Sequence, residues 1–421
     1  QLRAGRGQHG TQGMTVLPAG AAARYRAANA ATLRWMLARP RLHGAFLNTK
    51  LNPLTLTDYT DAEGWRGPDW TYGWIQGRGL ESLATHAADF ATRDPELARD
   101  LDVAGRALYN AVDALQVRDG HGFFRYGPDM MPVCGPDDGP LHPQARDGDI
   151  YTYSDAFFAK GLLCGAARYA PGDMPRQRDA LARVIDAIED NRFQMAEKVP
   201  LSPAMAAAEP GDFGPRMILL GAAGMLRRLG QGDATAYADR FVTHILSRHF
   251  DPATGLLRNV PGEDDCNVGH GIEFVGFALD HTGGGGDPET LRALARILAA
   301  SFDAGLDGSG IRLTVSAATA RGISPYRPWW SLPETIRAAA LLHRATGDPD
   351  ALRIWRMADE RFWAHYWRDT PPIAYQCLTE EGPVDYVPAT PCLDPGYHTG
   401  LSLLAAARVA DDIAPSQAEA S

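Results

Sequence analysis

The chain contains an apolar stretch, Asn267-Val268-Gly269-His270-Gly271-Ile272-Glu273-Phe274-Val275-Gly276-Phe277, that predicts the first turns of a buried helix. Within it, His270 and Glu273 stand three residues apart, so both side chains emerge from one helical face and can reach the same ligand. The glycines of the stretch allow a neighbouring backbone or a substrate to approach closely. Taken alone, such a pair is more often a hydrogen-bonded core pair than a catalytic one, so its role depends on the rest of the chain.

The rest of the chain alternates two kinds of helical segment. Segments that are apolar nearly all round, such as 153–169, are followed by segments with one charged face, such as 174–193. Helices of the first kind are buried, and those of the second lie at the surface. The expected helices are 25–38, 70–91, 95–116, 153–169, 174–193, 213–229, 235–248, 268–280, 288–302, 333–345, 348–367 and 397–410.

The apolar segments recur at a nearly regular distance. Their equivalent points near Met217, Glu273, Glu334 and Gly400 are separated by 56, 61 and 66 residues. Such a period fits a helical hairpin with a long loop, repeated about six times. We therefore predict an all-α fold, an (α/α)6 barrel of six helical hairpins, with short β-hairpins in its loops at 122–126, 256–260 and 374–378. An open helical solenoid is the alternative; polar and aromatic clusters at the starts of the apolar helices favour closure, because they suit convergence at one mouth.

Composition narrows the possible partners. The chain has 421 residues, 45% of them apolar, and a formal net charge of −10 without a long run of Lys or Arg. These values argue against nucleic acid and against an anionic membrane surface, and no apolar run reaches the roughly 18 residues of a membrane span. Five cysteines without a CxxC motif favour a reduced, cytoplasmic setting. We expect one barrel domain at 21–415, after a disordered leader or tag remnant at 1–20.

A barrel would bring the first residues of its inner helices to one rim, and the first such cluster lies between Trp70 and Arg78. It contains Tyr72, Trp74 and Gln76, and Asp69 comes directly before it. A buried guanidinium is costly unless it is paired. Arg78 is therefore expected either to hold a hydroxyl or carboxylate of a ligand or to form an ion pair with Glu81 or a neighbouring helix.

Two further rim clusters combine aromatic rings with carboxylates. Asp155 begins the segment 153–169, where a helix cap is the simpler role for it. The run Trp329-Trp330-Ser331-Leu332-Pro333-Glu334 places a carboxylate four residues after Trp330. Aromatic faces beside carboxylates and an arginine suit a sugar, which offers C–H faces for stacking and hydroxyls for hydrogen bonds. One of the two tryptophans is expected to be core.

His398 begins the last apolar segment, as His270 begins an earlier one. An imidazole titrates near neutrality and can move protons at physiological pH. Neither histidine belongs to an HExxH motif or a Cys/His cluster, and the chain has no Walker loop and no GxGxxG after a strand. We therefore expect no metal and no cofactor.

Together these motifs resemble the N-acylglucosamine 2-epimerase superfamily, which includes cellobiose 2-epimerases and mannose-type aldose–ketose isomerases. The resemblance is carried by Gly269-His270-Gly271-Ile272-Glu273, by Trp329-Trp330-Ser331-Leu332-Pro333-Glu334 and by Tyr397-His398. These motifs occur in the family's order, and the likeness covers roughly residues 25 to 410. The family's (α/α)6 barrel agrees with the hairpin period.

The resemblance implies roles for individual residues. His270 and His398 look like the family's two catalytic histidines, with Glu273 as an acidic partner. Arg78 looks like the arginine that orients an open-chain sugar near its carbonyl, where it would stabilise an enolate oxygen. Trp330 and Glu334 resemble the family's tryptophan and glutamate on the tenth helix. The implied partner is a small sugar or short saccharide, and the family's dimers suggest a homodimer.

The implied chemistry is proton abstraction beside a carbonyl. In a 2-epimerase one histidine removes the C2 proton and the other returns a proton to the opposite face. In an isomerase a base moves the proton from C2 to C1. No metal or nicotinamide is then needed.

Some departures from the family keep other functions open. Pro333 stands where a small polar residue is expected, the loop from Leu51 to Tyr72 is elaborate, and Asp155 adds a carboxylate. A glycoside hydrolase, for example one specific for uronic acids, is the alternative; it would use two carboxylates from Asp69, Asp155, Glu273 and Glu334. In that case Arg78 and His270 would hold the substrate carboxylate. A non-catalytic sugar-binding barrel is the third hypothesis.

Overall fold

The computed structural model describes residues 17–18, 20–386 and 389–418. The expected leader at 1–20 therefore falls almost entirely outside the described residues. The long helices in chain order are α1 (Ala21–Ala38), α2 (Gly73–Phe90), α3 (Pro95–Asp119), α4 (Tyr153–Tyr169), α5 (Met174–Glu189), α7 (Gly214–Arg228), α8 (Ala236–Arg248), α9 (Val268–Thr282), α10 (Pro288–Gly305), α11 (Ser331–Thr346), α12 (Pro349–Arg361) and α13 (Ser402–Ala418). A short helix, α6 (Pro203–Ala207), lies in a loop that sequence analysis left irregular. Two π-helical turns adjoin long helices: η5 (Phe362–Tyr366) follows α12, and η6 (Tyr397–Leu401) precedes α13.

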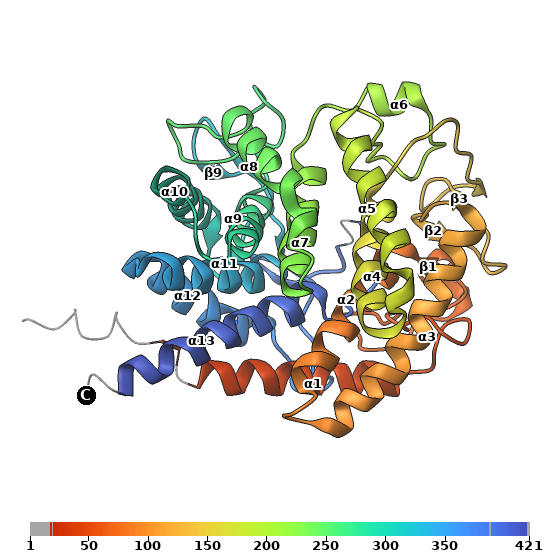
Figure 1. The fold of residues 1–421 in the computed structure, drawn as a ribbon, viewed down its shortest axis with the longest axis horizontal. Coiled ribbons are helices and arrows are strands. Elements are labelled where there is room, and N and C mark those ends of the chain that lie inside the picture. Colours follow the sequence, from red (N-terminus) through yellow and green to blue (C-terminus); the bar gives the residue numbers. More distant parts are fainter. Residues whose placement is uncertain (1–16, 19, 387–388, 419–421) are drawn as a thin grey trace, which may run out of the picture.

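The even alternation of buried and surface helices gives an (α/α)6 barrel. Helices α2, α4, α7, α9 and α11 each contact the next one in this series, and α11 contacts α13. The ring closes because η6, the turn that begins the last inner helix, contacts α2. The prediction of a closed barrel is thus confirmed over an open solenoid. Figure 1 shows the last helix, α13, beside the first, α1.

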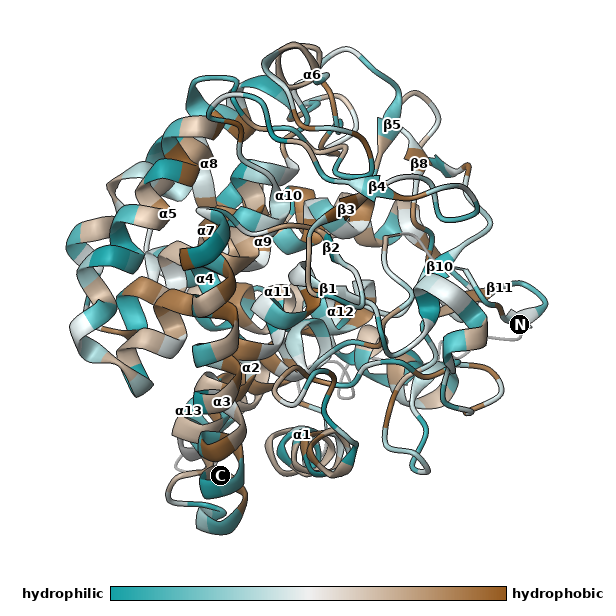
Figure 2. Ribbon diagram, turned by 90° about the vertical axis from the view of Figure 1, so that its right-hand side faces the viewer, coloured by the Kyte–Doolittle hydropathy of each residue, from teal (hydrophilic) through white to brown (hydrophobic). Residues whose placement is uncertain are grey.

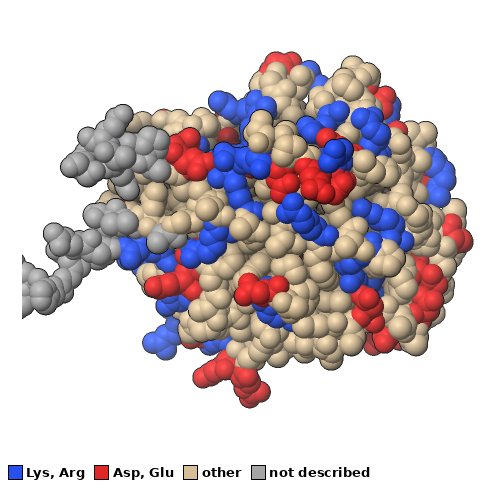
Figure 3. Space-filling model, turned by 90° about the horizontal axis from the view of Figure 1, so that it is seen from below, with Lys and Arg blue, Asp and Glu red and all other residues tan. Residues whose placement is uncertain are grey.

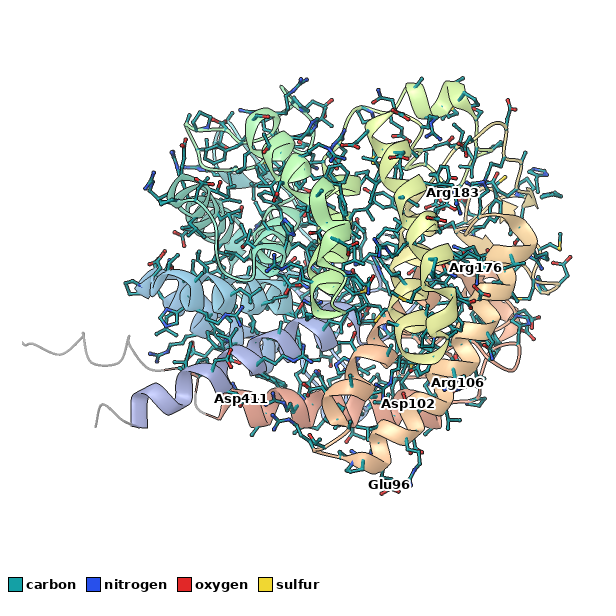
Figure 4. The ribbon with its side chains drawn as sticks, viewed as in Figure 1. Glu96, Asp102, Arg106, Arg176, Arg183 and Asp411 are labelled. Carbon is teal, nitrogen blue, oxygen red and sulfur yellow. The ribbon has the colours of Figure 1, made fainter. Side chains whose placement is uncertain are left out.

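Inner and outer helices differ in how their surfaces are used. Every residue of α11 from Ser331 to Leu342 is buried, whereas the outer helix α5 buries one face only. Hydrophobic colour marks long parts of the inner helices α2 and α4 in Figure 2. The labelled charged side chains of Figure 4 include Asp102 and Arg106 on α3 and Arg176 on α5, both outer helices. On the face drawn in Figure 3, acidic and basic side chains are interspersed.

The inner helices α2 and α4 approach each other closely. A Cβ added to Gly77 would lie 2.5 Å from the Phe157 carbonyl oxygen, and one added to Gly161 would lie 2.3 Å from that of Gly77. Only glycine allows the two backbones to meet at this distance. The contact fixes the part of α2 that carries Arg78.

Short strands connect the loops at the barrel rim. They are β1 (Thr71–Tyr72), β2 (Arg125–Tyr126), β3 (Val133–Cys134), β4 (His142–Pro143), β5 (Asp265–Cys266), β6 (Leu306–Asp307), β7 (Gly310–Ile311), β8 (Val315–Ser316), β9 (Arg321–Gly322), β10 (Arg327–Pro328), β11 (Cys377–Thr379) and β12 (Gly382–Pro383). The strand expected at 374–378 is β11, which pairs with β12 and also with the distant β10. The strand expected at 122–126 pairs with the distant β1 and, locally, only through a bridge between Tyr126 and Pro132. The segment 256–260 forms a single bridge, between Leu257 and Phe250.

Among the described residues, no helix is long and apolar enough to cross a membrane.

Candidate active site

The first turns of the inner helices surround a cavity of about 390 Å³. Because these helices run in the same direction around the ring, their N-terminal ends share one mouth. The lining residues on or beside these ends are Trp74, Arg78, Tyr153, Phe157, Met217, His270, Glu273, Trp329, Trp330 and His398. Aromatic rings form most of this part of the wall, and Arg78, His270, Glu273 and His398 add polar groups to it. Asn267, Gln376 and Asp394 line the cavity as well.

Arg78 points its guanidinium into this cavity without a protein partner. The described residues offer it no hydrogen bond and no ion pair, and its buried Nε is unbonded. Its Cζ lies 4.2 Å from the Phe157 ring centroid and 5.3 Å from that of Tyr397. Glu81, the partner considered from the sequence, instead lies 3.4 Å from the buried ammonium of Lys160. The guanidinium is therefore held by aromatic faces and keeps its donors for a ligand.

His270 presents an imidazole with no hydrogen bond to any described residue. The side chain of Asn267 caps α9 by accepting from the His270 backbone N–H at 3.2 Å. The ring lies 5.5 Å from Trp330, which approaches because Gly269 has no Cβ: one placed there would be 2.5 Å from the Trp330 ring. Burial, together with nearby His398 and Arg78, lowers the pKa of His270 to about 4. A neutral imidazole facing a cavity can accept a proton.

His398 stands at the start of η6. Its Nδ1 lies 2.9 Å from Glu334 Oε1 and 3.8 Å from Glu273 Oε1. With Nδ1 directed to a carboxylate, Nε2 is the ring nitrogen left for a ligand. Its ring centroid lies 5.6 Å from that of Trp330, so this tryptophan contacts both imidazoles. Burial and the charge of Arg78 lower the pKa of His398 to about 4.

The turn that delivers His398 is built by Asp394 and Gly396. Asp394 accepts hydrogen bonds from the backbone N–H groups of Tyr397, His398 and Thr399. Gly396 has φ +81°, and a Cβ there would lie 2.7 Å from Ser82 Oγ. The Asp-Pro-Gly sequence before His398 therefore has a structural reason.

The two glutamates beside His398 are almost completely buried. Burial raises the pKa of Glu273 to about 7, with a further contribution from the charge of Glu334. Burial also raises the pKa of Glu334 to about 7, although Arg337 pairs with its Oε2 and favours the charged form. Glu334 thus links two residues. His398 is 64 positions away from it along the chain, and Arg337 is one helical turn after it.

Donor atoms of Glu273, Glu334 and His398 all lie within 4.8 Å of one another, a spacing at which a metal ion could also be held. Two carboxylates and one imidazole form a donor set that several divalent ions accept. Arg337, however, already provides positive charge at Glu334.

Six of the predicted site residues line the cavity: Arg78, Trp74, His270, Glu273, Trp330 and His398. Glu334 does not line it but holds His398 from behind. Glu273 makes no hydrogen bond to His270 in the described residues; its carboxylate lies beside His398. The pairing of Glu273 with His270 suggested by their spacing is therefore not formed.

Four predicted substrate-binding residues do not line the cavity. Gln76 bonds the backbone of Leu47, because on α2 it faces away from the side shared by Trp74 and Arg78. Tyr72 packs against Phe124 and the buried Lys50 ammonium. Gln76 and Tyr72 were expected to contact substrate, but in the structure both have structural roles.

The other two are carboxylates. Asp155 forms a capping box with Thr152 and binds Arg146 and His121, so the simpler role considered for it applies. Asp69 is exposed on the surface outside the cavity lining.

Sequence analysis missed Tyr153, Phe157 and Met217 as cavity walls and Arg337 as the partner of Glu334. The signal for Tyr153 and Phe157 was their spacing of four on an inner helix, which puts them on one face. Arg337 follows Glu334 at i+3, a spacing typical of an ion pair, but the segment gave no sign that both would be buried.

Comparison with known proteins identifies relatives of the fold. No protein-family model matches the chain, and no curated protein matches its sequence. Among solved structures, a cellobiose 2-epimerase from Spirochaeta thermophila DSM 6192 is similar with a TM-score of 0.69 at 16% identity, over 94% of this chain and 100% of that one. A D-mannose isomerase is similar with a TM-score of 0.66 at 13% identity, over 93% and 100%. An unsaturated glucuronyl hydrolase specific for heparin gives 0.56 at 10% identity, over 93% and 98%. At these identities the likeness establishes the fold, and it agrees with the resemblance found in the motifs.

Proposed function

We propose that the chain is a sugar 2-epimerase or aldose–ketose isomerase that moves a proton at C2 of an open-chain sugar. The observation that carries the proposal is that two imidazoles with lowered pKa values, His270 and His398, line one cavity with an arginine that has no protein partner. The epimerase and isomerase structures that share the fold support the same class of reaction. The carbonyl chemistry needs no group beyond these side chains.

The proposed reaction uses each group at a stated atom. Arg78 donates to the carbonyl oxygen O1, so that negative charge developing there is stabilised. Neutral His270 takes the C2 proton; the C2–H electron pair forms the C1–C2 double bond, and the carbonyl electrons move to O1. His398, protonated at Nε2 and held at Nδ1 by Glu334, returns a proton to C2 on the opposite face to give the epimer.

Isomerisation needs a different return of the proton. If the proton arrives at C1 while the O2 proton passes to O1, and O2 becomes the carbonyl oxygen, the product is a ketose. The positions of two histidines around one cavity suit either outcome. The class of substrate is a free sugar or short saccharide, because the reaction needs an aldehyde and the cavity of about 390 Å³ exceeds a single sugar ring.

The glycoside hydrolase alternative has less support. It needs two carboxylates facing the substrate on either side of the scissile bond. Of the four candidates Asp69, Asp155, Glu273 and Glu334, only Glu273 lines the cavity. Asp394 and Asp385 line it too, but Asp394 caps η6 and Asp385 pairs with Arg66 at 2.6 Å. A non-catalytic sugar-binding barrel leaves the two imidazoles without a purpose.

We further propose a single domain at 21–415, a cytoplasmic setting, a homodimer and no nucleic-acid partner. All five cysteines are free, which suits a reduced compartment. Light scattering coupled to size exclusion tests the homodimer: a mass near 45 kDa, that of one chain, would contradict it.

The experiment that tests the function follows C2–H exchange by proton NMR. The protein is incubated in D2O with a panel of aldoses and short reducing saccharides. Loss of the C2 proton signal, with appearance of an epimer or ketose, is expected. His270→Ala and His398→Ala should each slow the exchange by about a hundredfold or more, and Arg240→Ala on the outer surface should not.

Two outcomes would contradict the proposal. One is an absence of exchange with every sugar together with release of reducing ends from glycosides, which would establish the hydrolase. The other is full activity in His398→Ala, which would exclude the two-histidine scheme.

A further inference from the structure

The barrel has a second cavity, of about 310 Å³, on the side away from the candidate active site. Most of its lining residues come from later turns of the same inner helices, beginning about one turn after the residues that line the first cavity. Five of them are arginines: Arg227, Arg228, Arg337, Arg344 and Arg408. The acidic residues in the lining are Glu81 and Asp280.

The ion pairs around this cavity leave part of the arginine donors unused. Arg228 pairs with Asp280, Arg408 with Asp89 at 3.1 Å, and Arg344 with Asp412 at 3.4 Å. Glu81 is paired with the buried Lys160. The side chain of Arg227, by contrast, has no hydrogen bond or ion pair with the residues that the structure describes. One full guanidinium is thus available at the exposed rim.

A second unused donor lies at the floor. Arg337 is 8% exposed, its Nε is buried without a hydrogen bond, and its Cζ lies 4.2 Å from the ring centroid of Phe277. Phe277 lines the same cavity. A buried donor without an acceptor is costly, so an acceptor supplied by a ligand would stabilise it.

The attraction of helix C-termini for cations explains only some of these residues. Arg227, Arg228 and Arg344 lie in the last turns of α7 and α11, where the helix dipole favours positive charge. Arg337 lies in the middle of α11, and the dipole does not account for it. Guanidinium groups that converge from an exposed rim to a buried floor are typical of phosphate recognition, since each offers a rigid fork of donors.

We propose that the second cavity binds a phosphate group, either free or carried by a small metabolite, between Arg227 and Arg344 at the rim and Arg337 at the floor. Neither this site nor its ligand depends on the proposed sugar chemistry, because binding is measured without any sugar. This site lies outside the reaction cavity, and its floor residue Arg337 pairs with Glu334.

Isothermal titration of the full chain with inorganic phosphate, and separately with glycerol 2-phosphate, tests the proposal. Titrations are run in chloride at matched ionic strength. Saturable binding of at least one ligand is expected, and the stronger of the two identifies whether the phosphate is free or esterified. Arg227→Ala combined with Arg344→Ala should weaken binding about tenfold or more, because charge-assisted hydrogen bonds are lost.

Arg178→Ala combined with Arg240→Ala, two exposed arginines on outer helices, is the matched control and should bind as the parent does. All replaced arginines are partly exposed, so circular dichroism is expected to show folded proteins, and phosphorus NMR of the parent chain gives an independent measure of binding. Absence of saturable binding of both ligands to the parent chain, or equal affinity in the Arg227/Arg344 variant, would overturn the proposal.

Discussion

The carboxylate of Glu334 uses its two oxygens differently. Oε1 lies 2.9 Å from His398 Nδ1, and Oε2 pairs with Arg337. We predict that Glu334→Gln lowers the rate of C2 exchange about a hundredfold, because a neutral amide still accepts the Nδ1–H bond but no longer stabilises an imidazolium. The KM should change little, since Glu334 does not line the cavity. Steady-state kinetics measure both constants.

Glu189→Gln is the matched control, because Glu189 pairs with Arg240 on the outer surface. Its rate should equal that of the parent chain. An unchanged rate in Glu334→Gln would mean that His398 does not rely on this carboxylate.

The cluster of Glu273, Glu334 and His398 gives a prediction about metals. In the proposed scheme Glu334 holds His398 and pairs with Arg337, and no step uses a metal ion. We therefore expect exchange to proceed unchanged after dialysis against EDTA. Loss of activity that a divalent ion restores would instead assign the cluster to a metal ion.

At the scale of elements, one buried hydrogen-bond network fastens the ends of the chain to the barrel. Asn29 on α1 donates to the carbonyl of Gly400 in η6 at 2.8 Å, and its Nδ2 lies 3.1 Å from His86 Nε2 on α2. We predict that Asn29→Ala lowers the free energy of unfolding by about 2–3 kcal/mol, because two buried acceptors lose their donor. Urea denaturation measures this change.

Arg34→Ala provides the comparison on the same helix. Its ion pair with Asp94 is largely exposed, so its loss should cost under about 1 kcal/mol. Similar losses for the two variants would contradict a special role for the Asn29 network.

The same network predicts a dependence of stability on pH. Burial lowers the pKa of His86 to about 4, below the value of about 6.5 that an unfolded chain would have. The folded state therefore excludes a proton that the unfolded state binds, so this contribution is complete above about pH 6.5 and is lost as the pH falls toward 4. The buried glutamates with raised pKa values act in the opposite direction over a similar range.

The prediction is tested by comparing slopes between variants. In His86→Gln, an amide can still accept from Asn29 and donate to the Ser82 carbonyl. The free energy of unfolding should then fall less steeply between pH 6.5 and 5 than in the parent chain, by about 2 kcal/mol over this interval. Parallel slopes would show that His86 is not buried as a neutral ring.

The helices were predictable from the sequence because burial on all sides and burial on one side leave different patterns along the chain. The regular spacing of the apolar helices along the chain predicted the barrel. Gly269, beside His270, indicated that another group approaches closely there, and in the structure that group is the Trp330 ring. What the sequence could not give was the rotation of each helix around its axis. That rotation turns Trp74 and Arg78 into the cavity and Gln76 away from it.

Contacts between residues far apart in the chain could not be predicted from the sequence either. The spacing of His270 and Glu273 suggested a pair, yet Glu273 lies beside His398, which is 125 positions further along the chain. Asp155 satisfied the pattern of a rim carboxylate and of a helix cap equally well, and only the positions of Thr152 and Arg146 decide for the cap.

At the scale of the whole molecule, an ion pair links the two cavities. Arg337 reaches the floor of the second cavity and pairs with Glu334, which holds His398 at the first. A phosphate on Arg337 would add negative charge close to both ionisable groups and compete for the guanidinium. Added negative charge favours the protonated forms, so the pKa values of Glu334 and His398 should rise.

This coupling predicts that phosphate changes the pH dependence of C2 exchange. With a protonated His398 required as the acid, the alkaline limb of the rate profile should move to higher pH by about half a pH unit when phosphate replaces chloride at equal ionic strength. In the Arg227→Ala/Arg344→Ala variant the limb should stay in place, because its phosphate site is weakened while His270, His398 and Glu334 are intact. A movement of equal size in both proteins would show that phosphate acts on the reaction cavity directly and that the two ends of the barrel are not coupled through Arg337.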